Sequence, residues 1–449
     1  MRVAFWIAAV PALLLSTASV QAAGFAAAGL SLGGSVIKLP SGQNGILTSG
    51  GVTVGGDAEP LIYAPNVGFN AAVGLGKWGE YDAFAGLNLF ASYGGSSASL
   101  TQTFSGIGTV YIPGLSLPDD GAITLGTSQG SSLLSSQAAY NVVNNPPTNN
   151  QITDAGAGST LPNVAGQTAG QVTISNGGEA FVVGGMNTDG DGSALAYGGI
   201  ADPTGSLLII TGDLDGLSIS TNTTTRVLYA GGDITVGVTK LHDSETSVQA
   251  YAGPSYRYLG QWTNTDTTAA SMTVNIPEVP NSPTLHPLWI QETTGTTSLS
   301  SHYFGGVAGA GMSRQVAEGT TLSIGAEASL YYLQSHLAGG GSVTTRDGQP
   351  PNSPLATVVY DPVDVMDGGL AFAVRGQASA SFVVAENLTL GLTGTVDYLS
   401  KVARPYAGAA VVTAADGDVS WSSSDAGNTL ISFGDMFVFT GAVSLNGHF

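Results

Sequence analysis

The last residues of the chain, 435–449, alternate strictly between two kinds of side chain. One phase carries Phe437, Phe439, Gly441, Val443, Leu445, Gly447 and Phe449, and the other carries Val438, Thr440, Ala442, Ser444, Asn446 and His448. Because successive side chains of a β-strand point to opposite faces, the pattern predicts a strand with one apolar face and one small or polar face. Such a strand suits a wall between hydrocarbon and a wet or filled interior.

The terminal residue, Phe449, adds a second signal. A C-terminal Phe on such a strand resembles the C-terminal signature of bacterial outer-membrane β-barrels, although Gly447 stands where that family often has an aromatic residue. The resemblance implies a chain that lies in the outer-membrane lipid of a Gram-negative bacterium. It also implies the barrel-assembly machinery as a partner, acting through the C-terminal strand.

The first residues, 1–22, have the features of a secretory signal peptide. Arg2 supplies a positive charge, residues 3–15 form an apolar stretch broken by Pro11, and Val20-Gln21-Ala22 fits the small-residue cleavage pattern. The alternative is an uncleaved anchor helix, but the apolar run is shorter than the ~20 residues that a membrane-spanning helix needs. The chain has no cysteine, which excludes disulfides and a lipid-attached N-terminal Cys.

The composition fits a lipid-embedded sheet better than a soluble domain. Charged residues make up only 9% of the chain and 65 of the 449 residues are Gly, whereas soluble proteins average about 25% charged residues. The formal net charge is −20, so nucleic acid is not expected as a partner, because binding a polyanion requires basic patches. Cations fit the charge better.

Short polar turns alternate with long connections along the chain, as a transmembrane barrel requires. The short turns are 76–80, 242–245, 316–319 and 385–387, and the long connections are 39–61, 94–225, 263–298, 338–367 and 404–432. If the C-terminus lies in the periplasm, all four turns are periplasmic and all five long connections are extracellular.

The stretches between these connections predict an all-β fold, an antiparallel up-and-down transmembrane β-barrel. Its ten strands are 24–38, 62–75, 81–93, 226–241, 246–262, 299–315, 320–337, 368–384, 388–403 and 433–449. Two β-prone runs inside 94–225 could extend the wall to twelve strands, and the facing of 299–315 stays open because both phases are rich in Gly and Ala. The domain organisation is then signal peptide 1–22, barrel strands 23–93, insert 94–225 and barrel strands 226–449.

Aromatic residues fall on the outward phase near the expected strand ends, where interfacial girdles lie in membrane barrels. They are Tyr63, Tyr93, Tyr256, Tyr258, Trp262, Tyr332, Tyr398 and Phe437 towards one end, and Tyr81, Phe382 and Phe449 towards the other. The alternative is that they are core aromatics of a soluble β-sandwich.

The insert 94–225 is acidic. No Lys or Arg lies between Lys77 and Arg226, and nine Asp and Glu residues give it a formal charge of −9. It is expected to form an extracellular β-subdomain or a partly disordered lobe.

Polar side chains on the inward phase are the candidates for function, because charge facing lipid is costly. The lumen candidates are Asp82, Asn88, Asp233, Arg257, Glu327, Arg375 and Asp397. If Val384 pairs with Leu388 around the turn 385–387, Arg375 stands directly opposite Asp397. If the turn 242–245 centres on Ser244, Asp233 and Arg257 pair diagonally. Such pairs act either as a structural plug or as a constriction that orients solutes.

A metal site is a second possibility in the insert. Asn187, Asp189, Asp191 and Gly192 match the first half of a calcium loop, and their oxygen ligands suit Ca²⁺. The twelfth position is Gly198 instead of the closing Glu, and Asp and Gly are also ordinary turn residues, so solvated turns are the alternative. No other cofactor is expected.

Two further motifs argue only weakly for an enzyme. His242-Asp243-Ser244 resembles the His-x-Ser arrangement of outer-membrane lipid hydrolases, but it lies in a turn expected on the periplasmic side. The ten-strand count is also similar to that of outer-membrane aspartyl-type proteases, but no paired Asp-Asp or His-Asp motif accompanies it. The sequence therefore predicts a non-enzymatic barrel that forms a narrow pore for small solutes. The alternative is a surface adhesin or structural protein whose acidic loops bind a partner while the barrel anchors them.

Overall fold

A computed structural model describes most of the expected barrel and part of the long connections. The described residues are 26–40, 46–48, 53–54, 61–105, 107–113, 121–128, 150–152, 167–174, 179–187, 194–202, 205–214, 217–270, 273–274, 286–287, 289–347, 354–359, 363–405, 410–415, 418–423 and 431–449. The expected signal peptide 1–22 lies outside them.

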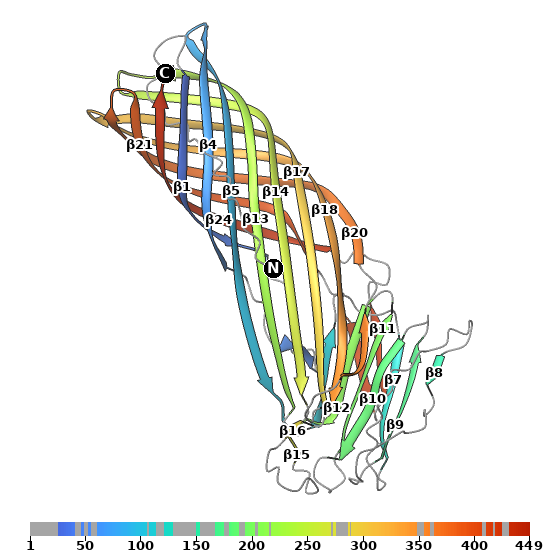
Figure 1. The fold of residues 1–449 in the computed structure, drawn as a ribbon. Coiled ribbons are helices and arrows are strands. Elements are labelled where there is room, and N and C mark those ends of the chain that lie inside the picture. Colours follow the sequence, from blue (N-terminus) through green and yellow to red (C-terminus); the bar gives the residue numbers. More distant parts are fainter. Residues whose placement is uncertain are drawn as a thin grey trace.

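Ten antiparallel strands form one closed ring (Figure 1). They are β1 (Ala26–Lys38), β4 (Leu61–Trp78), β5 (Tyr81–Thr103), β13 (Ser218–Leu241), β14 (Thr246–Ala270), β17 (Trp289–Ala317), β18 (Thr320–Asp347), β20 (Val363–Ala385), β21 (Leu388–Pro405) and β24 (Ile431–His448). Each strand pairs with its neighbours in this order, and the last strand, β24, pairs with β1 from Ala27↔His448 to Lys38↔Phe437. The prediction of an antiparallel up-and-down barrel is confirmed, and its wall has ten strands, not twelve.

The two ends of the barrel differ. The turns at 79–80, 242–245, 318–319 and 386–387 lie at one end, here called the turn end, and the long connections leave from the other, the loop end. In the turn 242–245, Asp243 Oδ1 accepts hydrogen bonds from the backbone N–H groups of Glu245 (2.8 Å) and Thr246 (2.7 Å). The bond from Glu245 is the main reason that the pKa of Asp243 lies below its usual value. The His-x-Ser motif thus forms part of a hydrogen-bonded hairpin turn.

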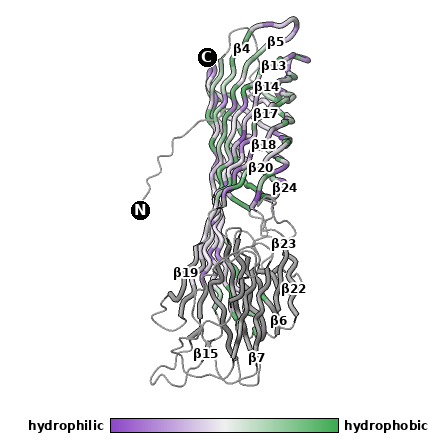
Figure 2. The backbone as a smooth tube through the Cα atoms, turned by 90° about the vertical axis from the view of Figure 1, so that its right-hand side faces the viewer, coloured by the Kyte–Doolittle hydropathy of each residue, from purple (hydrophilic) through white to green (hydrophobic). Residues whose placement is uncertain are grey.

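Hydrophobic and hydrophilic residues alternate along the strands of the ring, as the sequence predicts (Figure 2). On β18, Leu322, Ile324, Leu330 and Tyr332 are exposed, whereas Tyr331 and Leu333 are buried inside the ring. The sequence left open which side chains of β17 point outward. In the structure Tyr303 is 0% exposed and points inward, whereas Phe304 is 51% exposed and points outward. An apolar outer band around a closed ring is what a barrel surrounded by lipid requires. Among the described residues, no helix is long and apolar enough to cross a membrane.

A charge on this outer band should destabilise the barrel. Leu392 lies outward on β21, between Val443 on β24 and Ala380 on β20. Leu392→Arg is expected to lower the free energy of unfolding in lipid vesicles by about 2–4 kcal/mol, because the guanidinium would face hydrocarbon. Leu392→Phe is the matched control and should change it little. Equal stabilities of the two variants in urea titrations would contradict a lipid-facing position.

Five neighbouring strands continue well beyond the others at the loop end. These five strands are β5, β13, β14, β17 and β18, and they stay paired as far as Thr103↔Ser218, Ser218↔Ala270, Ala270↔Ile290 and Trp289↔Asp347. The short strand β19 (Pro354–Val359) pairs with the end of β18. Further short strands form a lobe next to this extension (Figure 1). One sheet has the order β10-β11-β12-β6-β2-β3 and another β22-β23-β7-β9-β8, and β15 pairs with β16.

The bounds of these short strands are β2 (Ile46–Thr48), β3 (Thr53–Val54), β6 (Ile107–Pro113), β7 (Gly121–Ser128), β8 (Asn150–Ile152), β9 (Gln167–Ile174), β10 (Glu179–Asn187), β11 (Ala194–Asp202), β12 (Gly205–Asp213), β15 (Thr273–Val274), β16 (His286–Pro287), β22 (Ala410–Ala415) and β23 (Asp418–Ser423). The strands that lie wholly within 94–225 therefore pair with one another and with strands of other connections, outside the ten-strand ring, whereas residues 94–103 and 218–225 extend the ring strands β5 and β13.

Candidate functional site in the barrel lumen

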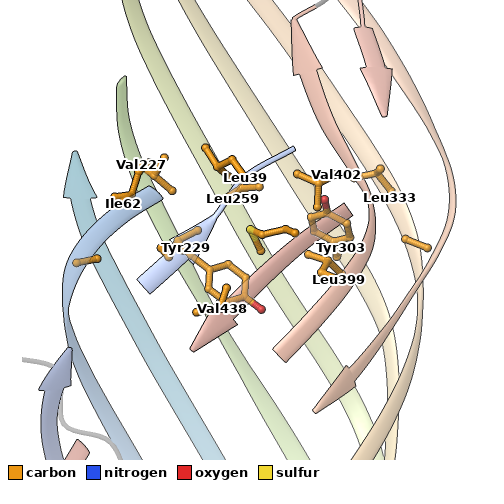
Figure 3. Packing of buried hydrophobic residues seen from close by; sticks show 14 of the residues in the cluster. Leu39, Ile62, Val227, Tyr229, Leu259, Tyr303, Leu333, Leu399, Val402 and Val438 are labelled. Atoms are coloured by element: carbon orange, nitrogen blue, oxygen red, sulfur yellow. The ribbon is translucent and has the colours of Figure 1, made fainter. Parts of the chain in front are cut away.

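A packed apolar layer crosses the lumen towards the loop end (Figure 3). Its buried members come from the inward phase of all but one of the ring strands and from the residue after β1: Ile37, Leu39, Ile62, Ala64, Val227, Tyr229, Leu259, Tyr303, Tyr331, Leu333, Ala371, Leu399, Val402, Met436 and Val438. The rings of Tyr303 and Tyr331 meet edge to face, with centroids 6.0 Å apart. This apolar layer fills a cross-section that a ten-strand barrel leaves narrow.

The end of β21 helps to close the same cross-section. Pairing between β20 and β21 extends in the described residues only to Ala373↔Leu399, and the ladder between β21 and β24 is irregular between Leu399 and Val402. Residues 400–405, here called the β21 tip, bend inward from there. Gln261 on β14 donates a hydrogen bond to the carbonyl oxygen of Ala403 (2.9 Å), although β14 and β21 are not neighbours in the ring.

Lys401 holds the β21 tip in place. Its φ of 54° is unusual for a residue other than Gly. Its Nζ donates to the carbonyl oxygen of Gly368 on β20 at 2.8 Å and lies 4.7 Å from the ring centroid of Phe433. The ammonium therefore ties the β21 tip to both β20 and β24.

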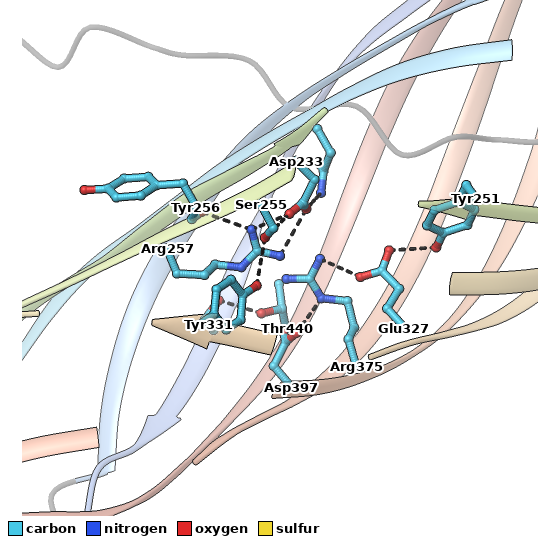
Figure 4. A network of polar contacts seen from close by, with 12 residues as sticks. Asp233, Tyr251, Ser255, Tyr256, Arg257, Glu327, Tyr331, Arg375, Asp397 and Thr440 are labelled. Carbon is cyan, nitrogen blue, oxygen red and sulfur yellow. Dashed lines mark hydrogen bonds and ion pairs between the residues drawn. The ribbon is translucent and has the colours of Figure 1, made fainter. Parts of the chain in front are cut away.

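A charged network lies in the lumen (Figure 4), and it touches the apolar layer where the hydroxyls of Ser255 and Tyr331 are hydrogen-bonded at 2.8 Å. Arg257 on β14 binds Asp233 on β13 through both terminal nitrogens, at 2.7 and 3.0 Å, and both side chains are only 4% exposed. Ser255 also donates to Asp233 (2.5 Å), and Asn88 donates to it from β5 (3.3 Å). The predicted diagonal pairing of Asp233 and Arg257 is confirmed, with Asp233 directly opposite Ser255.

The second half of the network centres on Arg375 of β20. Arg375 stands opposite Asp397 on β21, as predicted, and donates to it through Nε. The expected pairing of Val384 with Leu388 is wrong, because Leu388 pairs with Ala385 and the ladder shifts register between Val383 and Ala385. Arg375 also stands opposite Glu327 on β18, and its Nη1 donates to Oε2 of Glu327 at 3.4 Å. The hydroxyl of Tyr251 on β14 donates to the other carboxylate oxygen, Oε1, at 2.7 Å. These three charged side chains are 12–13% exposed. One guanidinium is thus shared between two carboxylates.

One aromatic ring joins the two halves of the network. Phe90 on β5 lies 4.9 Å from Cζ of Arg257 and 5.4 Å from Cζ of Arg375, measured to its ring centroid. It also packs against Tyr229 of the apolar layer, with centroids 5.1 Å apart. Cation–π contacts of this kind stabilise both guanidiniums in a partly dry site.

A cavity of about 110 Å³ borders this network inside the lumen. Arg375, Glu327, Asp397 and Asp233 line one part of it. Neutral polar side chains line much of the rest, among them Gln249, Gln377, Thr393, Thr395 and Thr440. We call this cavity the lumen chamber. It is large enough for a few water molecules or one small solute.

The lumen candidates do not all meet at one place. Asn88, Asp233, Arg257, Glu327, Arg375 and Asp397 belong to the charged network, whereas Asp82 lies near the turn end, opposite Thr239 and Lys77. One carboxylate oxygen of Asp82 is buried without a hydrogen-bond partner in the described part of the chain.

The calcium candidates lie largely outside the described residues. Asn187 ends β10, while Asp189 and Asp191 fall in a part that the structure does not describe. Among the described residues, no group of three or more His, Cys, Asp or Glu side chains is placed to hold a metal ion.

Sequence reasoning missed the apolar layer and the roles of Tyr251 and Phe90. The signal was present in part, because Tyr229, Leu259 and Tyr331 lie on the same phase as the polar lumen candidates. The sequence does not show at which height along the barrel axis the side chains of different strands lie, because that height depends on strand tilt and stagger.

No protein-family model matches the chain, and no curated protein matches it. Among solved structures, the chain is similar to a Pseudomonas aeruginosa FadL homologue at 8% identity and a TM-score of 0.22, with 95% of this chain and 90% of that chain covered. It is also similar to the CymD monoaromatic hydrocarbon channel, at 9% identity and a TM-score of 0.23, with 96% of this chain and 89% of that chain covered. A third similar structure is the P. putida toluene transporter TodX, at 7% identity and a TM-score of 0.21, with 95% of this chain and 90% of that chain covered. Similarity this low says nothing about function. The evidence for a barrel is the pairing of the ten strands described above.

Proposed function

We propose that the chain is an outer-membrane barrel of a Gram-negative bacterium that forms a narrow pore for small solutes. The observation that carries this proposal is the lumen chamber, a cavity with charges of both signs and neutral polar side chains in its lining, inside a ring whose outer face is apolar. Charged side chains of both signs around a cavity, here Arg375, Glu327 and Asp397, can form a constriction that orients permeating solutes. On this proposal the turn end faces the periplasm and the barrel-assembly machinery recognises β24.

The apolar layer is the closed gate of this pore. Hydrophobic constrictions stop water and ions by excluding water from the passage. We expect the β21 tip to be the part that moves, because in the described residues its pairing with β20 ends at Leu399. Lys401 then ties it to β20, while the pairing with β24 from Val402↔Gly434 to Pro405↔Ile431 holds its other side. Withdrawal of the β21 tip would remove Val402 from the apolar layer and Ala403 from a second buried cluster with Leu299, Leu337 and Ile431.

Liposome swelling with small neutral and charged solutes tests the proposal. Lys401→Met keeps the aliphatic stem but removes the ammonium that binds the Gly368 carbonyl, so it should swell liposomes faster than the wild type does. Lys240→Met is the matched control, because it removes an exposed ion pair with Glu80 at the turn end and should leave swelling unchanged. Absence of swelling with both the wild type and Lys401→Met would overturn the pore.

The second candidate is an adhesin or structural protein, in which the barrel anchors the acidic lobe. It is favoured by one observation, the cluster of buried apolar side chains that packs across the lumen. Replacing residues 107–213 by a short linker leaves β5 and β13 whole and separates the two functions. A pore keeps or increases its solute flux after this deletion, whereas an adhesin loses attachment to its partner.

A further inference from the structure

We infer that the lumen chamber is a binding site for one small monovalent cation. The first observation is the charge beside it. Arg257 and Asp233 form a mutually compensated pair with two short contacts. Arg375 is shared between Glu327 and Asp397. The network therefore holds three carboxylates and two guanidiniums, which leaves one negative charge next to the cavity.

That charge lies where it is poorly solvated. Glu327 and Asp397 are almost entirely buried, the apolar layer closes the lumen on one side, and hydrocarbon surrounds the ring. An uncompensated buried charge is unfavourable in such surroundings, so a positive charge within a few ångströms stabilises the fold. The lumen chamber is the space beside these carboxylates that can hold it.

The second observation is independent of charge and concerns the neutral lining. Thr393 is only 9% exposed, it lines the lumen chamber, and its Oγ1 is buried without a hydrogen-bond partner in the described residues. Buried hydroxyls in folded proteins are normally hydrogen-bonded, so this oxygen points to a bound group. Gln249, Gln377, Thr395 and Thr440 line the same cavity, and the hydroxyl of Thr440 is hydrogen-bonded to that of Ser35 (2.8 Å).

Oxygen atoms from hydroxyls, amides and a carboxylate are the ligands that hard cations prefer. A single residual charge matches a monovalent ion better than a divalent one, which would leave the site with an excess positive charge. The chemical class is therefore Na⁺, K⁺ or ammonium. The inference rests on the proposed function for its role, namely that the pore favours small cations over anions. The presence of the site does not depend on conduction.

Thermal unfolding of the full-length protein in a non-ionic detergent tests the site without measuring transport. N-methyl-D-glucamine chloride is exchanged for KCl, NaCl or NH4Cl at constant ionic strength and pH. The wild type is expected to gain a few degrees in its unfolding midpoint with at least one of the small ions. Thr393→Val, which removes the free hydroxyl, and Glu327→Gln, which removes the residual charge, should each lose this gain. Glu245→Gln, an exposed acid at the turn end, should keep it.

Soaking crystals with thallium(I), a heavy monovalent cation, locates the ion by its anomalous scattering. A peak in the lumen chamber within reach of Thr393 and Asp397 supports the site. The inference is overturned if the wild-type midpoint does not respond to the cation, if both lumen variants respond as the wild type does, or if thallium binds only elsewhere. It is also overturned if infrared spectra in KCl show a carboxyl of the network protonated, because a proton would then compensate the charge. If liposomes swell but the unfolding midpoint does not respond to cations, only the cation site is refuted. If the midpoint responds to cations but liposomes do not swell, only the pore is refuted.

Discussion

Replacing Arg375 with methionine should lower the free energy of unfolding of the barrel by about 3–5 kcal/mol, because it leaves two buried carboxylates without their partner. Glu327 and Asp397 lie on the strands to either side of β20 and both depend on this one guanidinium. Methionine keeps most of the side-chain volume, so the loss reflects charge and not a cavity. Urea unfolding in detergent micelles or lipid vesicles measures it.

The triple variant Arg375→Met, Glu327→Gln, Asp397→Asn is the internal control for this prediction. It removes the guanidinium together with both carboxylates and should recover much of the lost stability, since no unpaired charge is left at this position. The external control is Arg314→Met, which breaks an exposed contact with Glu245 at 3.7 Å and should cost less than about 1 kcal/mol. If Arg375→Met is no more costly than Arg314→Met, the network does not hold the lumen together.

Replacing Tyr303 with alanine should convert a closed barrel into one that conducts. Tyr303 is fully buried at the centre of the apolar layer, against Tyr331 and the β21 tip, where its hydroxyl lies 3.4 Å from the carbonyl oxygen of Lys401. Its removal leaves a gap in the layer that water can enter, and the lost packing should cost about 3–5 kcal/mol of stability. Planar-bilayer recordings should show discrete openings that are absent or much rarer in the wild type.

Tyr332 provides the matched control for the gate. It is the neighbour of Tyr331 on β18, but it points outward and is exposed. Tyr332→Ala removes the same atoms from the outer face, so it should leave conductance at the wild-type level. Equal conductance of the Tyr303 and Tyr332 variants would show that the apolar layer is not the barrier to solutes.

Short turns explain why much of the lumen could be predicted from the sequence. A tight hairpin fixes the register of its two strands, and the turn 242–245 places Asp233 diagonal to Arg257 as expected. At the other turn Leu388 pairs with Ala385 and not with Val384, and a shift in the ladder between Val383 and Ala385 restores the register that sets Arg375 opposite Asp397. Both pairings hold in the structure. The alternation of apolar and polar residues likewise fixed which face of each strand is outward wherever the two phases differ.

Other contacts could not be predicted, for a related reason. Glu327 and Arg375 lie on β18 and β20, which are joined by the long connection 338–367, and such a loop does not set a register. On β17 the two phases are similar in composition, so the sequence did not show that Tyr303 points inward. The apolar layer and the β21 tip depend on how far the strands are tilted, which local patterns do not encode.

The most direct test of the barrel itself uses the absence of cysteine from the chain. Single cysteines placed in turn at residues 322–332 of β18 can each carry a nitroxide spin label in protein reconstituted into lipid. Even-numbered positions, which include Leu322, Ile324, Leu330 and Tyr332, should be accessible to oxygen dissolved in the bilayer, and odd-numbered positions, which include Glu327 and Tyr331, should be protected. Accessibility without a two-residue period, or access of a water-soluble nickel chelate to the even positions, would contradict a closed ring surrounded by lipid.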